Sequence, residues 1–223
     1  MSNFFTSSVG KKFIMSITGI FLMLFLIVHL TVNSLLMVGP DAFNSAAHFM
    51  TTNSFIMVLE PLLALGFIIH IIYSAYLTMQ NQRLRPVHYK KVDRWGSSTW
   101  PSRNMFILGG LVLIFLVIHL SNFFWKVKFG DLDTVMVQGT QMHDLYGLVS
   151  ALFINWWWYD LVYILGALFL ALHLSHGLWA AFQSLGWNND KWRLRLKRIA
   201  YVFAVVMGVG FSVIPLYFLI STS

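Results

Sequence analysis

Cysteine is absent from the 223-residue chain. Disulfide bonds, cysteine-ligated iron–sulfur clusters and thioether-linked haem are therefore excluded within this chain. Charged residues are also scarce, at 10% of the sequence, whereas soluble domains carry about 25%. With 58% hydrophobic residues and a mean hydropathy of +0.71, the composition excludes an ordinary soluble domain and indicates a membrane protein.

Long apolar runs account for the scarcity of charge. Runs of about 18 or more apolar residues are typical of transmembrane helices, and five such runs occur here. They predict an all-α integral membrane bundle, with residues 1–223 forming one transmembrane domain. The first run is too long for the apolar part of a signal peptide, so we expect it to be retained. The predicted helices are residues 13–37, 55–79, 105–125, 159–182 and 199–220, joined by loops.

Lysine and arginine are unevenly distributed between the two sides of this predicted bundle. Thirteen of the fifteen lie at the N-terminus and between helices two and three and helices four and five. The other side has only Lys126 and Lys128. The positive-inside rule therefore predicts a cytoplasmic N-terminus and an outside C-terminus. The same distribution explains the net charge of +7 without a nucleic-acid partner.

Each of the first four predicted helices carries one histidine deep in its apolar run. An ionisable residue inside a membrane is costly, so it indicates function. At a helical rise of about 1.5 Å per residue, His29 and His119 lie about 12 Å and about 9 Å from the outer ends of their helices. By the same rise, His70 and His173 both lie about 14 Å from the inner ends. Two pairs at two depths predict two non-covalently held haems, each with two axial histidines.

Other interpretations of these histidines remain open. A single histidine on an apolar helix is often a hydrogen-bonded core residue, and several can form a metal-ion path or a proton relay. His176 lies one turn from His173 on a similar helix face, so it is an alternative ligand or a contact for a haem propionate. Cationic partners for the propionates are Arg83 and Arg103 on the inner side and Lys126 on the outer side.

Two further features fit a haem-binding bundle. Small residues allow a bulky group to approach the helices closely. These residues are Ser16, Gly19, Gly66, Gly109, Gly110, Gly166 and Gly177. Glu60 lies near the outer end of the second helix, where a carboxylate could exchange protons with a quinone. The alternative for Glu60 is an acid that stabilises the start of its helix.

Several motifs resemble a known family. The stretch from Ser16-x-x-Gly19 to His29 is similar to the first helix of the diheme cytochrome b anchor of succinate dehydrogenase and quinol:fumarate reductase. Residues 172–187, Leu-His-Leu-Ser-His-Gly-Leu-Trp-Ala-Ala-Phe-Gln-Ser-Leu-Gly-Trp, resemble its fourth helix and the loop that follows. Ser102-Arg103-Asn104 and Asp144-Leu-Tyr146 also fit this pattern. The resemblance extends over nearly the whole chain.

The resemblance implies a five-helix, two-haem anchor in the bacterial cytoplasmic membrane. It implies one axial histidine in each of the first four helices, which are His29, His70, His119 and His173 here, with helix one paired with three and two with four. It also implies a cytoplasmic flavoprotein subunit, an iron–sulfur subunit and electron transfer between succinate and menaquinone. The alternatives are a fumarate reductase working in reverse, a cytochrome b anchor for a hydrogenase or formate dehydrogenase, and a haem-free transporter with a histidine path.

Overall fold

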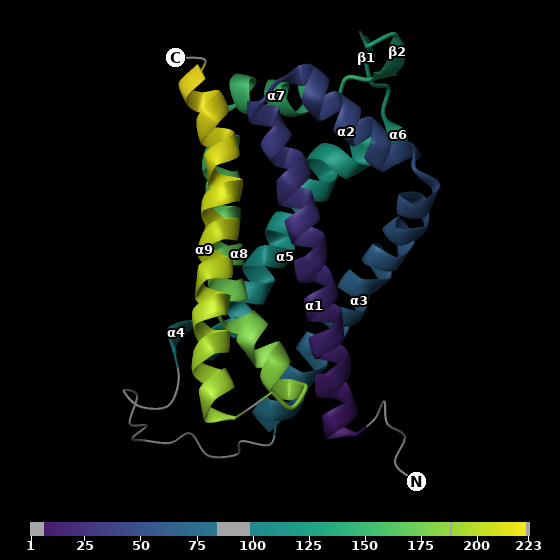
Figure 1. The fold of residues 1–223 in the computed structure, drawn as a ribbon. Coiled ribbons are helices and arrows are strands. Elements are labelled where there is room, and N and C mark those ends of the chain that lie inside the picture. The colour runs from purple at the N-terminus through teal and green to yellow at the C-terminus, as the bar shows by residue number, and fades with distance from the viewer. Residues whose placement is uncertain (1–6, 84–98, 188, 222–223) are drawn as a thin grey trace.

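The computed structural model describes residues 7–83, 99–187 and 189–221. Within these ranges, five helical segments are long and apolar enough to cross a membrane, so the predicted number of spans is confirmed (Figure 1). Four of them are continuous helices. They extend past the predicted limits at both ends, except that the first ends, with a 3₁₀ turn, at the predicted Met37. These helices are α1 (Ser8–Ser34, followed by a 3₁₀ turn at Leu35–Met37), α3 (Ser54–Arg83), α8 (Trp157–Ser184) and α9 (Asp190–Ser221).

The remaining span is built from three consecutive helical pieces. α5 covers Met105–His119, a π-helical segment covers Leu120–Phe124, and α6 covers Trp125–Phe129. A short helix, α4 (Trp100–Arg103), precedes them. π-Helical segments are rare and are frequently found at functional sites. The break in regular α-helix therefore marks the residues directly after His119 as a region of interest.

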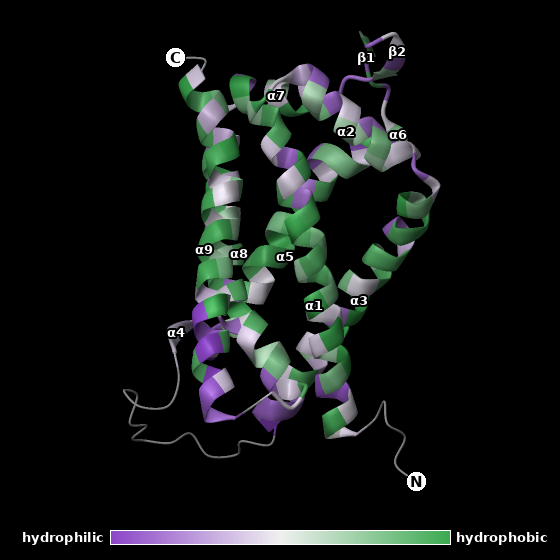
Figure 2. Cartoon of the chain, viewed as in Figure 1, coloured by the Kyte–Doolittle hydropathy of each residue, from purple (hydrophilic) through white to green (hydrophobic). Residues whose placement is uncertain are grey.

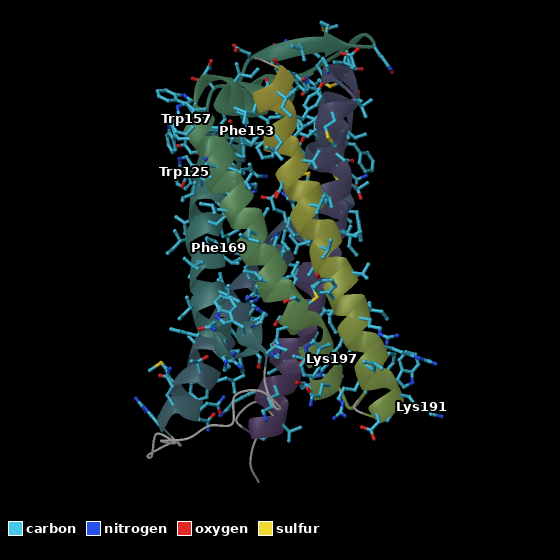
Figure 3. All side chains as sticks on the ribbon, turned by 90° about the vertical axis from the view of Figure 1, so that its left-hand side faces the viewer. Trp125, Phe153, Trp157, Phe169, Lys191 and Lys197 are labelled. Carbon is cyan, nitrogen blue, oxygen red and sulfur yellow. The ribbon has the colours of Figure 1, made fainter. Side chains whose placement is uncertain are left out.

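The two ends of the bundle differ in chemistry. Hydrophilic residues cluster where α1 and α9 begin and α3 ends, and we call this the basic end (Figure 2). Lys191 and Lys197 lie there, whereas Trp125 and Trp157 lie toward the opposite end (Figure 3). Tryptophan is typical of membrane–water interfaces. Four basic residues of the segment predicted to follow the second helix lie outside the described residues: Arg85, Lys90, Lys91 and Arg94.

The opposite end, which we call the capped end, is covered by ordered structure where the sequence predicts loops. The cap consists of α2 (Pro40–Thr52), strands β1 (Thr134–Val137) and β2 (Thr140–His143), and α7 (Leu145–Asn155) (Figure 1). The loop prediction was wrong because long-range contacts within the cap order these segments, with local turns at two points. Gly39 (φ +144°) precedes Pro40 at the start of α2, a favoured position for proline. Gln138 and Gly139 have φ of +50° and +80°, as a tight hairpin turn requires.

One buried asparagine joins two parts of the cap. Asn44 of α2 is 1% exposed, and its amide nitrogen donates to Asp144 Oδ1 at 2.9 Å. Its side-chain oxygen accepts from the backbone N–H of Tyr146 at 2.7 Å. Asp144 also caps α7 by accepting from the backbone N–H of Gly147. These bonds fix α2 against the start of α7.

We expect Asn44→Ala to destabilise the cap. The change leaves the Tyr146 N–H without its acceptor and removes one of the two donors to Asp144 Oδ1, which costs roughly 1–3 kcal/mol. Thermal unfolding and hydrogen exchange of α2 and α7 measure the effect. Gln141→Ala is the matched control, because that side chain makes one exposed hydrogen bond to Thr134. Equal stability of the two variants would contradict the assigned role of Asn44.

The helices divide into a closely packed part and an open part. α8 and α9 form the most extensive helix pair in the described residues, and a Cβ added at Gly208 would lie 2.8 Å from Ala171 Cβ. By contrast, α3 leans away from the other helices toward the capped end (Figure 1). Gly66 is its only residue classed as buried. The space between α1, α3, α5 and α8 is where the candidate site lies.

Candidate functional site

A cavity of about 1030 Å³ lies between the helices, and residues of α1, α3, α5 and α8 line it. Small-molecule sites range up to about 1000 Å³, so this space suits large or multiple ligands. Most lining side chains are apolar, as expected for a cofactor site. Each of the four helices contributes a predicted histidine to its wall: His29, His70, His119 and His173.

The first histidine pair joins α1 and α5. The ring centroids of His29 and His119 are 5.6 Å apart, with an angle of 87° between the ring planes. Asn33 Nδ2 lies 3.4 Å from His29 Nδ1 and also donates to the His29 carbonyl at 2.8 Å. The asparagine thus lies against one ring nitrogen of His29. The π-helical segment begins directly after His119.

The second pair joins α3 and α8, nearer the basic end. The ring centroids of His70 and His173 are 6.5 Å apart, with an interplanar angle of 71°. Thr18 Oγ1 lies 3.4 Å from His70 Nδ1. Each imidazole also faces a glycine: a Cβ added at Gly19 would lie 3.4 Å from His70 Cε1, and one added at Gly109 would lie 3.6 Å from His173 Cε1. Larger residues at these glycines would crowd the rings.

The spacing of both pairs suits one metal atom between two imidazoles. With metal–nitrogen bonds of about 2 Å, two imidazoles on opposite sides of a metal have ring centroids roughly 6 Å apart. A bare ion needs more ligands, and no group of three or more His, Asp or Glu in the described residues could supply them. A porphyrin provides the missing four nitrogens. The donor set therefore fits haem better than a free metal ion.

Unpartnered ring nitrogens support a role in ligand binding. Within the described residues, the Nδ1 atoms of His119, His173 and His176 are buried and have no hydrogen-bond partner. Burying a polar atom without a partner costs free energy, and such atoms often mark a functional site or an absent water. These three histidines are therefore not explained as hydrogen-bonded core residues.

The other predicted site residues separate into two groups. Ser16, Gly19 and His176 line the cavity. Arg83 and Arg103 do not line it, and both are exposed. At the basic end the cavity wall instead includes a set of polar side chains that sequence analysis did not single out: Lys12, Ser74, Asn81, Gln183 and Ser184.

Glu60 lies away from the cavity wall. Its carboxylate forms an ion pair with Lys128 Nζ at 2.8 Å, and the side chain is 41% exposed. This contact joins the start of α3 to α6. Lys126, the predicted outer propionate partner, is also exposed and does not line the cavity.

Three buried polar residues near the capped end were missed by sequence analysis. Asp160 in the first turn of α8 is 1% exposed. Tyr163 lines the cavity, and Asn122 Nδ2 donates to its hydroxyl at 3.2 Å. The sequence feature that could have identified this site is the acidic residue Asp160 at the start of the fourth apolar run.

Comparison with curated proteins finds similarity to the succinate dehydrogenase cytochrome b558 subunit of Bacillus subtilis (strain 168). The two are 27% identical over 194 residues, which cover 86% of each chain. No protein-family model and no solved structure matches the chain. The similarity covers most of both proteins and confirms the resemblance inferred from the motifs. The chain is thus a distant homologue of the cytochrome b558 subunit of succinate dehydrogenase.

Proposed function

We propose that this chain is the haem-bearing membrane anchor of a succinate:menaquinone oxidoreductase in the bacterial cytoplasmic membrane. The observation that carries the proposal is that two pairs of histidines face each other within one apolar cavity: His29 with His119, and His70 with His173. The homology to a succinate dehydrogenase cytochrome subunit supports the same assignment. This homology favours the anchor of a succinate dehydrogenase over the cytochrome b anchor of a hydrogenase or formate dehydrogenase.

In this proposal the chain's own residues hold two b haems at two levels. His29 and His119 would hold the haem nearer the capped end, and His70 and His173 would hold the one nearer the basic end. Haem iron bound by two histidines supplies reversible one-electron chemistry. Gly19 and Gly109 leave room beside the imidazoles of the second pair. His176 lies in the cavity wall one turn from His173, where it can contact a propionate.

The direction of the chain in the membrane follows from its charge. The basic end faces the cytoplasm by the positive-inside rule, and the capped end faces outside. The described basic residues at the start of α9 offer an electrostatic surface for an iron–sulfur subunit, which in turn carries a flavoprotein subunit. Quinone reacts at the level of the pair nearer the capped end. The same anchor in a fumarate reductase would work in the opposite direction.

A reduced-minus-oxidised optical spectrum of the purified complex tests this proposal. We expect two b-type haems per copy of this chain, both reduced on addition of succinate. Pyridine haemochrome quantification gives the stoichiometry, and mass spectrometry identifies the co-purified subunits. A complex without haem would overturn the proposal and favour the transporter. A haem-bearing complex with hydrogenase or formate dehydrogenase subunits would overturn the assignment to succinate.

A further inference from the structure

A buried carboxyl group near the capped end has no hydrogen-bond partner in the described part of the chain. Neither side-chain oxygen of Asp160 has a hydrogen-bond partner among the residues that the structure describes. No side chain caps the start of α8, so the acid does not serve as the helix cap. Keeping a carboxylate ionised without water, a donor or a cation is costly. Intramembrane acids of this kind mark proton or ligand sites.

Asp160 lies on the helix face that leads into the cavity. Residues three apart on a helix share a face, which places Tyr163 one turn further along on the same side. Tyr163 lines the cavity, and its ring centroid is 6.0 Å from that of His119. Its hydroxyl accepts from Asn122, so its own O–H remains available for another acceptor. Tyr163 therefore stands between the buried acid and the cavity beside the first histidine pair.

Asp160 is a better source of protons for this cavity than Glu60. Glu60 is 41% exposed, is held in an ion pair with Lys128 and lies outside the cavity wall. Asp160 has neither a cation partner nor solvent contact in the described residues.

We propose that Asp160 supplies a proton, through the hydroxyl of Tyr163, to a quinone bound at the capped end of the cavity. This inference rests on the proposed function. Reduction of a quinone to a quinol takes two electrons, which succinate oxidation provides, and two protons, one for each carbonyl oxygen. Tyr163 gives its hydroxyl proton to one oxygen and regains a proton from Asp160, whose side chain has to turn toward that hydroxyl because the two make no hydrogen bond in this structure. Asp160 then regains a proton from the aqueous phase at the capped end, which also supplies the second proton of the quinol.

Asp160→Asn in the intact complex tests this role, because asparagine keeps the shape and removes the acidic proton. General acid catalysis contributes about 10²–10⁴-fold, so we expect succinate:quinone reductase activity to fall at least about 100-fold. Succinate-dependent reduction of an artificial dye and the haem content should not change. Asp160→Glu should restore a large part of the activity. Asp131→Asn, which alters an exposed acid at the same end, is the matched control and should behave as wild type.

A redox-induced infrared difference spectrum separates proton donation from a structural effect. We expect a protonated-carboxyl C=O band that shifts in Asp160→Glu and disappears in Asp160→Asn. Normal quinone reduction by Asp160→Asn would overturn the inference, as would a carboxyl band that neither variant changes. If the Asp160→Asn complex does not assemble, the Asp160→Glu complex tests the inference: a shifted carboxyl band supports it, and an unshifted band overturns it. A wild-type complex that binds haem but does not reduce quinone with succinate would instead contradict the proposed function.

Discussion

Replacing His70 or His173 with alanine is expected to leave one haem per chain in place of two. Each haem would lose one of its two histidine ligands, and among the described residues His176, near His173, is the one further histidine that lines the cavity. His29→Ala and His119→Ala should each remove the other haem, so the four variants should fall into two spectral classes. Haem quantification with redox titration of the purified complexes measures the result, because the remaining haem keeps its own midpoint potential.

The control for these variants is His143→Ala, which removes an exposed histidine of β2 and should retain both haems. The pairing would be contradicted if His70→Ala and His29→Ala lost the same spectral component. Retention of two haems in His173→Ala, together with loss of one haem in the double variant His173→Ala/His176→Ala, would identify His176 as a ligand.

Gly166→Val is expected to remove the haem held by His29 and His119 without touching either histidine. A Cβ at Gly166 would overlap the ring of Phe115, which therefore has to move. Phe115 packs 5.9 Å from His119 and 5.2 Å from Tyr163, ring centroid to ring centroid, so its displacement shifts the wall around His119. Overpacking of this kind costs roughly 1–3 kcal/mol of stability. The haem spectrum and the thermal unfolding midpoint measure the two effects.

Leu168→Ala provides the matched control on the same helix. Leu168 lies two residues along α8 and is 49% exposed, so the change alters a membrane-facing side chain without crowding α5. We expect this variant to bind two haems. If Gly166→Val also binds two haems with unchanged potentials, the contact between Phe115 and α8 does not position His119.

The spans and the proximity of the histidines follow from simple regularities in the sequence. An apolar run long enough to cross a membrane has few alternatives to a helix. The rise per residue then fixes the depth of each histidine, so those at equal depth on neighbouring helices face each other. The structure brings His29 to His119 and His70 to His173; that each pair holds a haem stays a prediction.

The cap and the acidic residues depend on contacts that no local pattern reveals. Residues 40–52 contain polar side chains at the membrane surface, so they resemble a loop until Asn44 is buried against α7. Glu60 meets Lys128, far along the chain, only after α3 and α6 approach each other. Asp160 follows Trp156–Trp158 and has the sequence of an interfacial acid, yet helix packing buries it completely. In each case tertiary structure overrides the local signal.

The lean of α3 has a consequence for how the protein assembles. α3 packs mainly on α1 and only weakly on α5 within the described residues, so protein contacts alone restrain it little. A haem bound by both His70 and His173 would link α3 to α8 across the cavity. Cofactor insertion would then act as the last folding step. Newly made chains would remain susceptible to proteolysis around α3 until the cofactor is in place.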